Sequence, residues 1–212
     1  MKKVYLLMLS LVLGFVLVAC GEESSDNENT AESKENNSSE EQNNDESKDK
    51  ENTVSVEEGE TIDNEVGKFT IANKKKDMNE VIENGPMKLT ITGIQSATLE
   101  PNGDYKAMFD NKDKLTVVTV GMKTENTSEE TVSFYPDQAT LTTNAGDQVD
   151  ADLMLSDDVG GDFYGQTKKE GEVIFQLDTP AADISDIKLI INGAHDENID
   201  SLGEDIQLPL SF

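Results

Sequence analysis

The sequence predicts an all-β protein, an antiparallel β-sandwich of about seven to nine strands in residues 66–212. Apolar residues alternate with polar ones in several short stretches there, which is the period of a strand with one buried face. Gly, Asn, Asp and Pro separate these stretches. A domain of this size buries roughly 68–70% of its unfolded surface, which is enough for a core without disulfides.

The expected strands follow one another along the domain, and each carries apolar residues at alternate positions. They cover residues 69–71, 87–92, 115–124, 132–134, 139–141, 172–178, 187–192 and 206–212. Residues 74–83 are expected to form one short helix, ended by Asn84-Gly85-Pro86. The stretch Asn-Ala-Gly-Asp at residues 144–147 predicts a turn.

The N-terminus has the features of a lipoprotein signal peptide over residues 1–19. Two lysines precede an apolar run, which is shorter than the roughly 20 residues that a membrane span needs. Leu17-Val18-Ala19-Cys20 then matches a lipobox, whose cysteine thiol accepts a diacylglyceryl group. Because two acyl chains anchor a protein stably, we expect lipidation of Cys20 at the outer face of a bacterial cytoplasmic membrane. The alternative is an ordinary signal peptide or an anchor helix with an incidental cysteine.

Residues 20–65 are expected to form a disordered acidic linker behind the lipidated cysteine. Residues 21–65 hold 17 acidic residues and 3 lysines, and Ala31 is the only apolar residue between Glu22 and Thr53. Such a segment cannot bury enough apolar surface to offset its ordering entropy. We interpret it as a tether, since about 45 flexible residues reach roughly 35–40 Å. The alternative is a cation-buffering brush.

The composition limits the partners and the cross-links that the chain can have. Seventeen lysines and no arginine face 44 acidic residues, for a net charge of −27. Nucleic acid is therefore no partner, because its phosphates require a basic face. Cations and basic partners are favoured instead. Cys20 is the only cysteine, so the expected secreted domain has no disulfide.

Four stretches, residues 87–94, 115–128, 139–148 and 169–177, resemble a domain of unknown function in Gram-positive surface lipoproteins. That family has an immunoglobulin-like sandwich and is related to a secreted mycobacterial immunogenic antigen. The resemblance covers roughly residues 85–195 and rests on strands and turns. It implies an Ig-like fold and a surface location, and it supplies no activity and no functional residues. The cysteine pair and core tryptophan of antibody domains are absent, so the Ig-like label describes architecture alone.

The sequence offers no catalytic constellation. His195 is the single histidine and is expected to lie in a polar turn after a strand. No nucleophile elbow, zinc-protease motif or phosphate loop appears, and a zinc site cannot be built from one histidine. Paired carboxylates can hydrolyse glycosides, so a wall-glycan hydrolase stays as a remote alternative. It would require a pocket with two converging carboxylates, one of raised pKa.

Calcium is the one cofactor candidate, because it prefers six to eight oxygen ligands. Residues 156–162, Ser-Asp-Asp-Val-Gly-Gly-Asp, give a candidate site in Asp157, Asp158 and Asp162. Residues 196–205 begin like an EF-hand loop, but they lack its glycine and its bidentate glutamate. Both clusters are alternatively read as solvated acidic loops.

We expect a non-catalytic binding module for an envelope protein or a wall component. Phe134-Tyr135-Pro136 and Phe163-Tyr164 place aromatic rings beside loops, where they either contact a ligand or cap the core. Asn126-Thr127-Ser128 matches the sequence motif of a glycosylation site, but in a bacterial lipoprotein it predicts only a turn. A calcium-dependent surface module is the second hypothesis.

Overall fold

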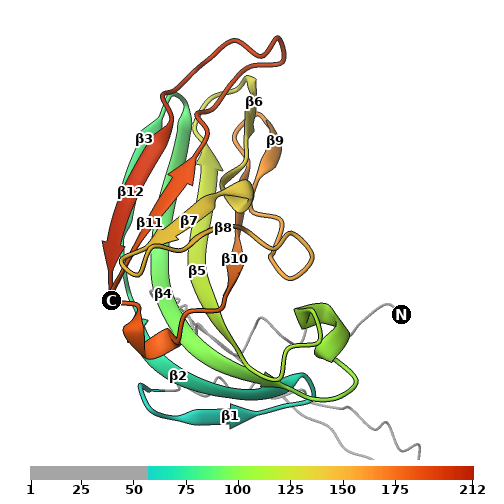
Figure 1. The fold of residues 1–212 in the computed structure, drawn as a ribbon. Coiled ribbons are helices and arrows are strands. Elements are labelled where there is room, and N and C mark those ends of the chain that lie inside the picture. The colour runs from blue at the N-terminus through green and yellow to red at the C-terminus, as the bar shows by residue number, and fades with distance from the viewer. Residues whose placement is uncertain (1–56) are drawn as a thin grey trace, which may run out of the picture.

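The computed structural model describes residues 57–212, which form a sandwich of antiparallel strands without an α-helix in that range (Figure 1). The signal peptide, Cys20 and most of the linker lie outside the described residues. Strand β1 (Thr61–Asp63) lies before Val66, so the fold includes residues that the sequence assigned to the linker. No helix among residues 57–212 is long and apolar enough to span a membrane.

Six strands form the larger sheet, in the order β1-β2-β4-β5-β10, with β3 also pairing with β4. Its members after β1 are β2 (Gly67–Lys75), β3 (Glu80–Asn84), β4 (Met87–Pro101), β5 (Leu115–Asn126) and β10 (Lys168–Leu177). Strand β4 is long enough to pair with two strands on the same side: β3 pairs with its residues 87–91 and β2 with its residues 94–101.

The second sheet has the order β12-β11-β7-β8 and packs against the larger one (Figure 1). Its strands are β7 (Thr140–Thr143), β8 (Gln148–Asp150), β11 (Asp186–Ile191) and β12 (Ile206–Ser211). A separate two-stranded sheet joins β6 (Thr131–Phe134) to β9 (Gly161–Tyr164). Short 3-10 helices η2 (Lys106–Phe109), η3 (Pro136–Gln138) and η4 (Ala181–Asp183) occupy connections.

The sandwich prediction is therefore confirmed, and the sequence pattern found eight of the twelve strands. The helix expected at residues 74–83 is wrong. Strand β2 continues through Lys75, and β3 begins at Glu80. Between them Asp77 adopts a positive φ of 54°, and the Met78 N–H donates to the Thr92 carbonyl, so the chain turns back onto β4.

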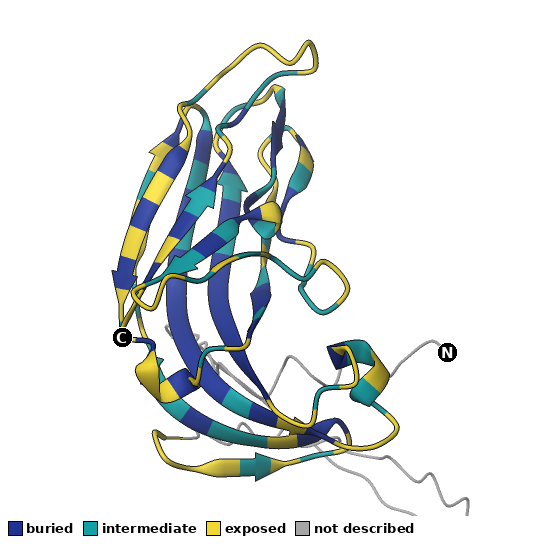
Figure 2. Cartoon of the chain, in the orientation of Figure 1, coloured by how far each residue is buried: buried dark blue, intermediate teal, exposed yellow. Residues whose placement is uncertain are grey.

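Two large apolar clusters and one small one hold the layers together. The largest one lies between the sheets. Figure 2 shows that buried and exposed residues alternate along β12, because one face of this strand packs against that cluster. The second cluster includes Leu99, Leu115, Val117 and Ile174. These side chains alternate with main-core residues such as Val118 and Val173, so the larger sheet is partly covered on both faces.

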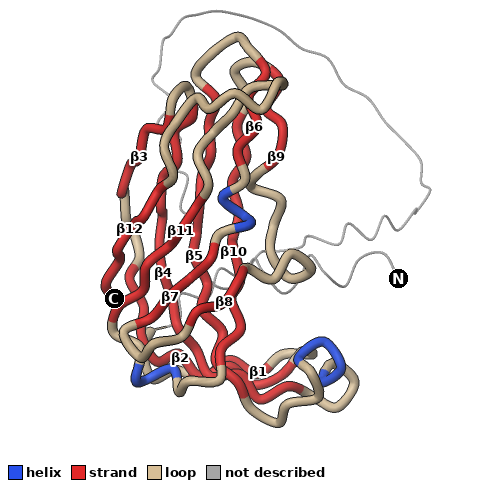
Figure 3. The backbone as a smooth tube through the Cα atoms, turned by 45° about the horizontal axis from the view of Figure 1, so that its top comes forward, coloured by secondary structure: helices blue, strands red, loops and turns tan. Residues whose placement is uncertain are grey.

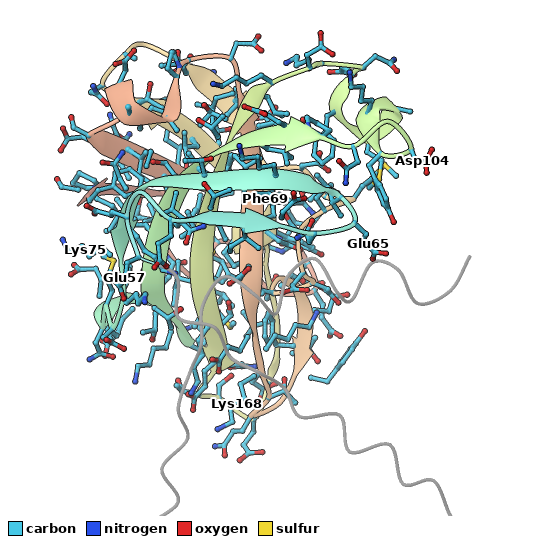
Figure 4. All side chains as sticks on the ribbon, turned by 90° about the horizontal axis from the view of Figure 1, so that it is seen from below. Glu57, Glu65, Phe69, Lys75, Asp104 and Lys168 are labelled. Atoms are coloured by element: carbon cyan, nitrogen blue, oxygen red, sulfur yellow. The ribbon has the colours of Figure 1, made fainter. Side chains whose placement is uncertain are left out.

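The surface is dominated by charge, and acidic and basic side chains are interspersed around β2. Figure 4 shows Glu57 and Lys75 at one end of this strand, and Glu65 and Asp104 at the other. The Glu57 carboxylate also forms an ion pair with Lys76 at 3.3 Å. Exposed pairs of this kind contribute only roughly 0–1 kcal/mol, so the apolar clusters carry the stability of the fold.

Candidate binding face on β6 and β9

Strands β6 and β9 lie at the same end of the sandwich as the long loop between β11 and β12 (Figures 1 and 3). Their register pairs Val132 with Phe163 and Ser133 with Asp162. Successive side chains of a strand point to opposite faces. Val132 and Phe163 are buried in the main core, so Ser133, Asp162 and Tyr164 belong to the outward face.

His195 extends this small sheet on the side of β6 away from β9. The Ser133 N–H donates to the His195 carbonyl at 2.9 Å, and the His195 N–H donates to the Ser133 carbonyl at 3.0 Å. His195 also bridges to Ser201 across the same loop. The prediction of His195 in a polar turn missed this pairing, which places the imidazole ring beside the outward residues of β6.

A hydrogen-bond network fixes the polar groups of this face. Asp162 Oδ1 accepts a 2.6 Å bond from Ser133 Oγ and a 3.3 Å bond from the Tyr135 hydroxyl. The Tyr135 ring stacks on the His195 ring, with centroids 6.2 Å apart and planes at 27°. Desolvation and the nearby Asp162 carboxylate raise the pKa of Tyr135 above its usual range, so its hydroxyl stays a donor.

The same face carries an exposed aromatic ring, since Tyr164 is 71% exposed. Asp162 is exposed as well, and its Oδ1 is held by the network. The arrangement therefore presents a fixed carboxylate between two tyrosines. We name the outward residues Ser133, Tyr135, Asp162, Tyr164 and His195 the tyrosine face. It has the groups to bind a ligand with a cationic or hydroxyl-bearing surface, since carboxylates accept charge-assisted bonds and tyrosines combine apolar area with a polar tip.

The three aspartates proposed for calcium have separate partners in the structure. Asp157 Oδ2 accepts the Glu172 main-chain N–H at 2.9 Å, and Asp162 belongs to the tyrosine face. Asp158 Oδ1 pairs with the Lys169 ammonium at 2.8 Å. Among residues 57–212, no three acidic, histidine or cysteine side chains are grouped closely enough to hold a metal ion.

Lys169 supplies the positive charge at the acidic loop. Besides Asp158, its ammonium bonds the Gly160 carbonyl and lies 5.5 Å from the centre of the Phe163 ring. Burial raises the pKa of the Asp137 carboxyl above its usual range, and the charges of Asp158 and Lys169 act on the same group. Lys169 thus neutralises Asp158, one of the three aspartates named for calcium.

The second acidic loop, residues 196–205, is organised by its own hydrogen bonds. Asp196 Oδ1 accepts the N–H groups of Asn198 and Asp200, each at 2.8 Å. Ile199 lies at the turn with a positive φ of 67° and is 80% exposed. A β-branched residue rarely adopts this conformation, so the local Asp196 bonds stabilise a strained turn. The resemblance to an EF-hand does not extend to the structure.

One residue with unusual chemistry escaped the sequence reasoning. Glu172 is only 7% exposed, and its Oε2 has no hydrogen-bond partner within the described part of the chain. Burial raises the pKa of Glu172 to about 8. The Asp157 carboxylate also raises this pKa, and the Lys74 charge lowers it. The hydrolase alternative requires such a pair of carboxylates in a pocket. Here Asp157 Oδ2 accepts the Glu172 main-chain N–H, and Glu172 is buried while Asp157 is half-buried.

Comparison with known proteins supports a lipoprotein. No protein-family profile matches the chain. The chain is similar to the SPbeta prophage-derived uncharacterized lipoprotein YonS of Bacillus subtilis, with 27% identity over 145 residues. That match covers 67% of this chain and 64% of YonS, so the chain spans less than two thirds of its relative.

Two solved structures superpose on the chain to different extents. A functionally unknown protein from Listeria monocytogenes superposes with a TM-score of 0.55 at 14% identity, covering 68% of this chain and 88% of that protein. The yjhA protein from Bacillus subtilis gives a TM-score of 0.42 at 12% identity, covering 63% and 97%. The Listeria structure supports the fold alone. A relation to the mycobacterial antigen and its Ig-like family stays a prediction.

Proposed function

We propose that this chain is a lipid-anchored protein of a Gram-positive surface, and that its sandwich is a non-catalytic binding module. The tyrosine face is the proposed contact surface. The location rests on the lipobox at Cys20 and on the similarity to an uncharacterized lipoprotein. The partner is an envelope protein or a wall component.

The observation that carries the binding role is the fixed Asp162 carboxylate beside the exposed Tyr164 ring. Both residues lie on β9, whose opposite face is packed in the core through Phe163, so the contact surface is rigid before a partner arrives. Rigid contact groups lower the entropy that is lost on binding. Aromatic residues are enriched in the centres of protein interfaces, which further favours this face.

The absence of catalysis is part of the proposal and rests on the chemistry of the face. Its carboxylate accepts bonds from Ser133 and Tyr135, and the His195 Nδ1 lies 3.0 Å from the Asp196 carbonyl. A hydrolytic triad requires a histidine held by an acid and directed at a nucleophile. His195 instead stacks on a tyrosine, which suits a contact surface.

Quantitative binding to isolated envelope fractions tests the proposal. Full-length chain purified in detergent is titrated against washed cell walls and against membranes of a Gram-positive host, with Asp162→Asn and Tyr164→Ala as variants. Met154→Ala is the matched control, because Met154 is also a large exposed apolar residue but lies in another loop. Saturable binding that both face variants weaken and the control leaves unchanged supports the proposal. Binding that is indifferent to both face variants refutes it.

Anchoring is tested separately by Cys20→Ala in cells. The lipidated chain is expected in the membrane fraction, and the variant is expected to leave it because it has no thiol for the acyl chains. Equal membrane retention of both chains would contradict the lipid anchor.

A further inference from the structure

The free edge of β9 has unpaired main-chain groups beside the tyrosine face. Both main-chain groups of Ser133 bond His195, so Ser133 and Asp162 form a pair without mutual hydrogen bonds. In an antiparallel ladder such pairs alternate with bonded ones. The N–H and C=O groups of Asp162 and Tyr164 therefore point away from β6. Within residues 57–212, β9 pairs with no other strand, and no turn or loop bond involves these groups.

The longer edge strand β10 is protected, in contrast. The segment between β8 and β9 runs along it: the Asp152 N–H donates to the Ile174 carbonyl, and the Asp157 N–H donates to the Glu172 carbonyl. Ser156 Oγ and Asp157 Oδ2 accept the two N–H groups of Ile174 and Glu172. We call residues 152–157 the strap. Proteins protect edges in this way because a bare edge recruits other strands.

Two other edge positions are closed by different means. The outer strand β12 carries Pro209, which has no N–H to offer. On β9 itself, the Lys169 ammonium caps the Gly160 carbonyl at the start of the strand. The uncapped part of this edge is the stretch from Asp162 to Tyr164, which is also where the tyrosine face ends.

We propose that the edge of β9 at Asp162 and Tyr164 binds an extended basic segment of a partner protein by β-strand addition. This inference rests on the proposed binding role and specifies its partner. Main-chain bonds to an exposed edge supply affinity, and alternate side chains supply specificity. A lysine or arginine opposite Asp162 forms a cross-strand ion pair, and the next residue on that face lies against the Tyr164 ring.

Charge favours a basic occupant over a neutral or acidic one. The chain has a net charge of −27 and no arginine. Asp162 keeps its carboxylate at the surface, while the nearby Asp158 already neutralises Lys169. An acidic strand would meet the Asp162 charge directly, and like charges opposite each other destabilise a strand pair.

Two designed hexapeptides test the inference on full-length chain in detergent. One alternates lysine with valine and the other alternates glutamate with valine, both with blocked ends. Peptide binding is measured by calorimetry, and hydrogen exchange reports on the Asp162 and Tyr164 amides. The expected result is saturable binding of the lysine peptide alone, with slower exchange of these two amides. Absence of saturable binding up to about 1 mM peptide, the weak limit of useful affinity, overturns the inference.

Substitutions separate the main-chain contact from the side-chain contact. Tyr164→Pro removes the edge N–H, while Tyr164→Ala removes the ring and keeps the N–H, so the proline variant is expected to bind the lysine peptide more weakly than the alanine variant. Equal affinities of the two variants refute strand addition. Asp162→Asn keeps the side-chain acceptor for Ser133 and is expected to weaken binding about fivefold. Thermal unfolding confirms that each variant is folded, and the asparagine variant decides the case if the proline variant is not.

The outcomes also distinguish this inference from the proposed function. If envelope fractions bind through the tyrosine face and the lysine peptide does not bind, the binding role survives and strand addition fails. If neither binds in a way that depends on Asp162 or Tyr164, both fail.

Discussion

Removal of the ionisable group at Glu172 is expected to stabilise the chain more at alkaline pH than at acid pH. The carboxyl is buried, its Oε2 lacks a partner among the described residues, and Asp157 lies beside it. Burial first, and then the Asp157 charge, raise the pKa of Glu172 to about 8 from 4.5. The folded chain therefore holds the proton more tightly than the unfolded chain does.

The sign and size of the effect follow from proton linkage. A raised pKa in the folded state contributes stability that is fully present below pH 4.5 and is lost as the pH rises through about 8. A shift of this size corresponds to about 5 kcal/mol, since one pKa unit is about 1.4 kcal/mol. This is an upper limit, because local opening of the strap admits water to the ionised carboxylate and reduces the cost.

The assay is urea unfolding of the full chain in detergent at pH 5, 7 and 9, for the native chain and Glu172→Gln. Glutamine keeps the shape and cannot ionise, so its stability relative to the native chain is expected to rise by several kcal/mol, at most about 5, from pH 5 to pH 9. Glu170→Gln is the matched control, because Glu170 lies on the same strand and is exposed. The Glu170→Gln variant also loses one negative charge, but the lost charge is an exposed one.

The comparison isolates Glu172 because every other titrating group is common to both chains. A difference between Glu172→Gln and the native chain that is the same at pH 5 and pH 9 would refute the argument. So would an equal pH response in Glu170→Gln, since that would mean that reduced net charge alone is responsible.

Three further outcomes follow from the packing and the charges. Gly171→Ala is expected to destabilise the fold by about 1–3 kcal/mol in urea unfolding, because the new Cβ would lie 2.5 Å from the Asp157 Cβ. Gly103→Ala is the control, because a Cβ there meets nothing within 4 Å. Equal losses of stability in the two variants would contradict the clash. Phe163→Ala is expected to cost about 3–5 kcal/mol by the same assay, because the ring is fully buried in the main core, and a loss below about 1 kcal/mol would contradict that packing. Calcium and magnesium at equal concentrations are expected to raise the melting temperature equally, because Lys169 already occupies the acidic loop; a calcium-specific rise that saturates would restore the calcium site.

The sequence predicted the fold where strands were long enough to show their period. Alternation in β5, β10 and β12 left no ambiguity, and each of these strands has one face in the main core. The short strands β1 and β8 each have three residues, too few to display a period. The lysine-rich end of β2 and the start of β3 were read as a helix, because their pairing depends on β4, a partner that local sequence does not reveal.

The candidate site was less accessible from sequence, because its parts meet only through the register. Residues 156–162 were given as a candidate calcium site, with a solvated acidic loop as the alternative, whereas Gly161 begins strand β9 with a positive φ of 107°. The proximity of Asp162 to Ser133 follows from the pairing of β6 with β9, and that of His195 from a bridge across 62 positions of sequence. The sequence analysis did not single out Glu172, because the strap that covers the edge of β10 is not visible in any local pattern.

Several acidic residues of the loops serve as hydrogen-bond acceptors for the fold, a role that composition alone does not reveal. Asp157 accepts a main-chain N–H at the edge of β10, and Asp196 accepts the N–H groups of a strained turn. In each case a carboxylate does what a neighbouring strand or helix would otherwise do, because a buried or edge N–H requires an acceptor. These carboxylates therefore give little information about ligands. Asp162 differs, because its acceptor bonds come from side chains on a face that is already folded, beside main-chain groups that pair with no other strand of residues 57–212. That combination, rather than the number of acidic residues, is what points to a partner.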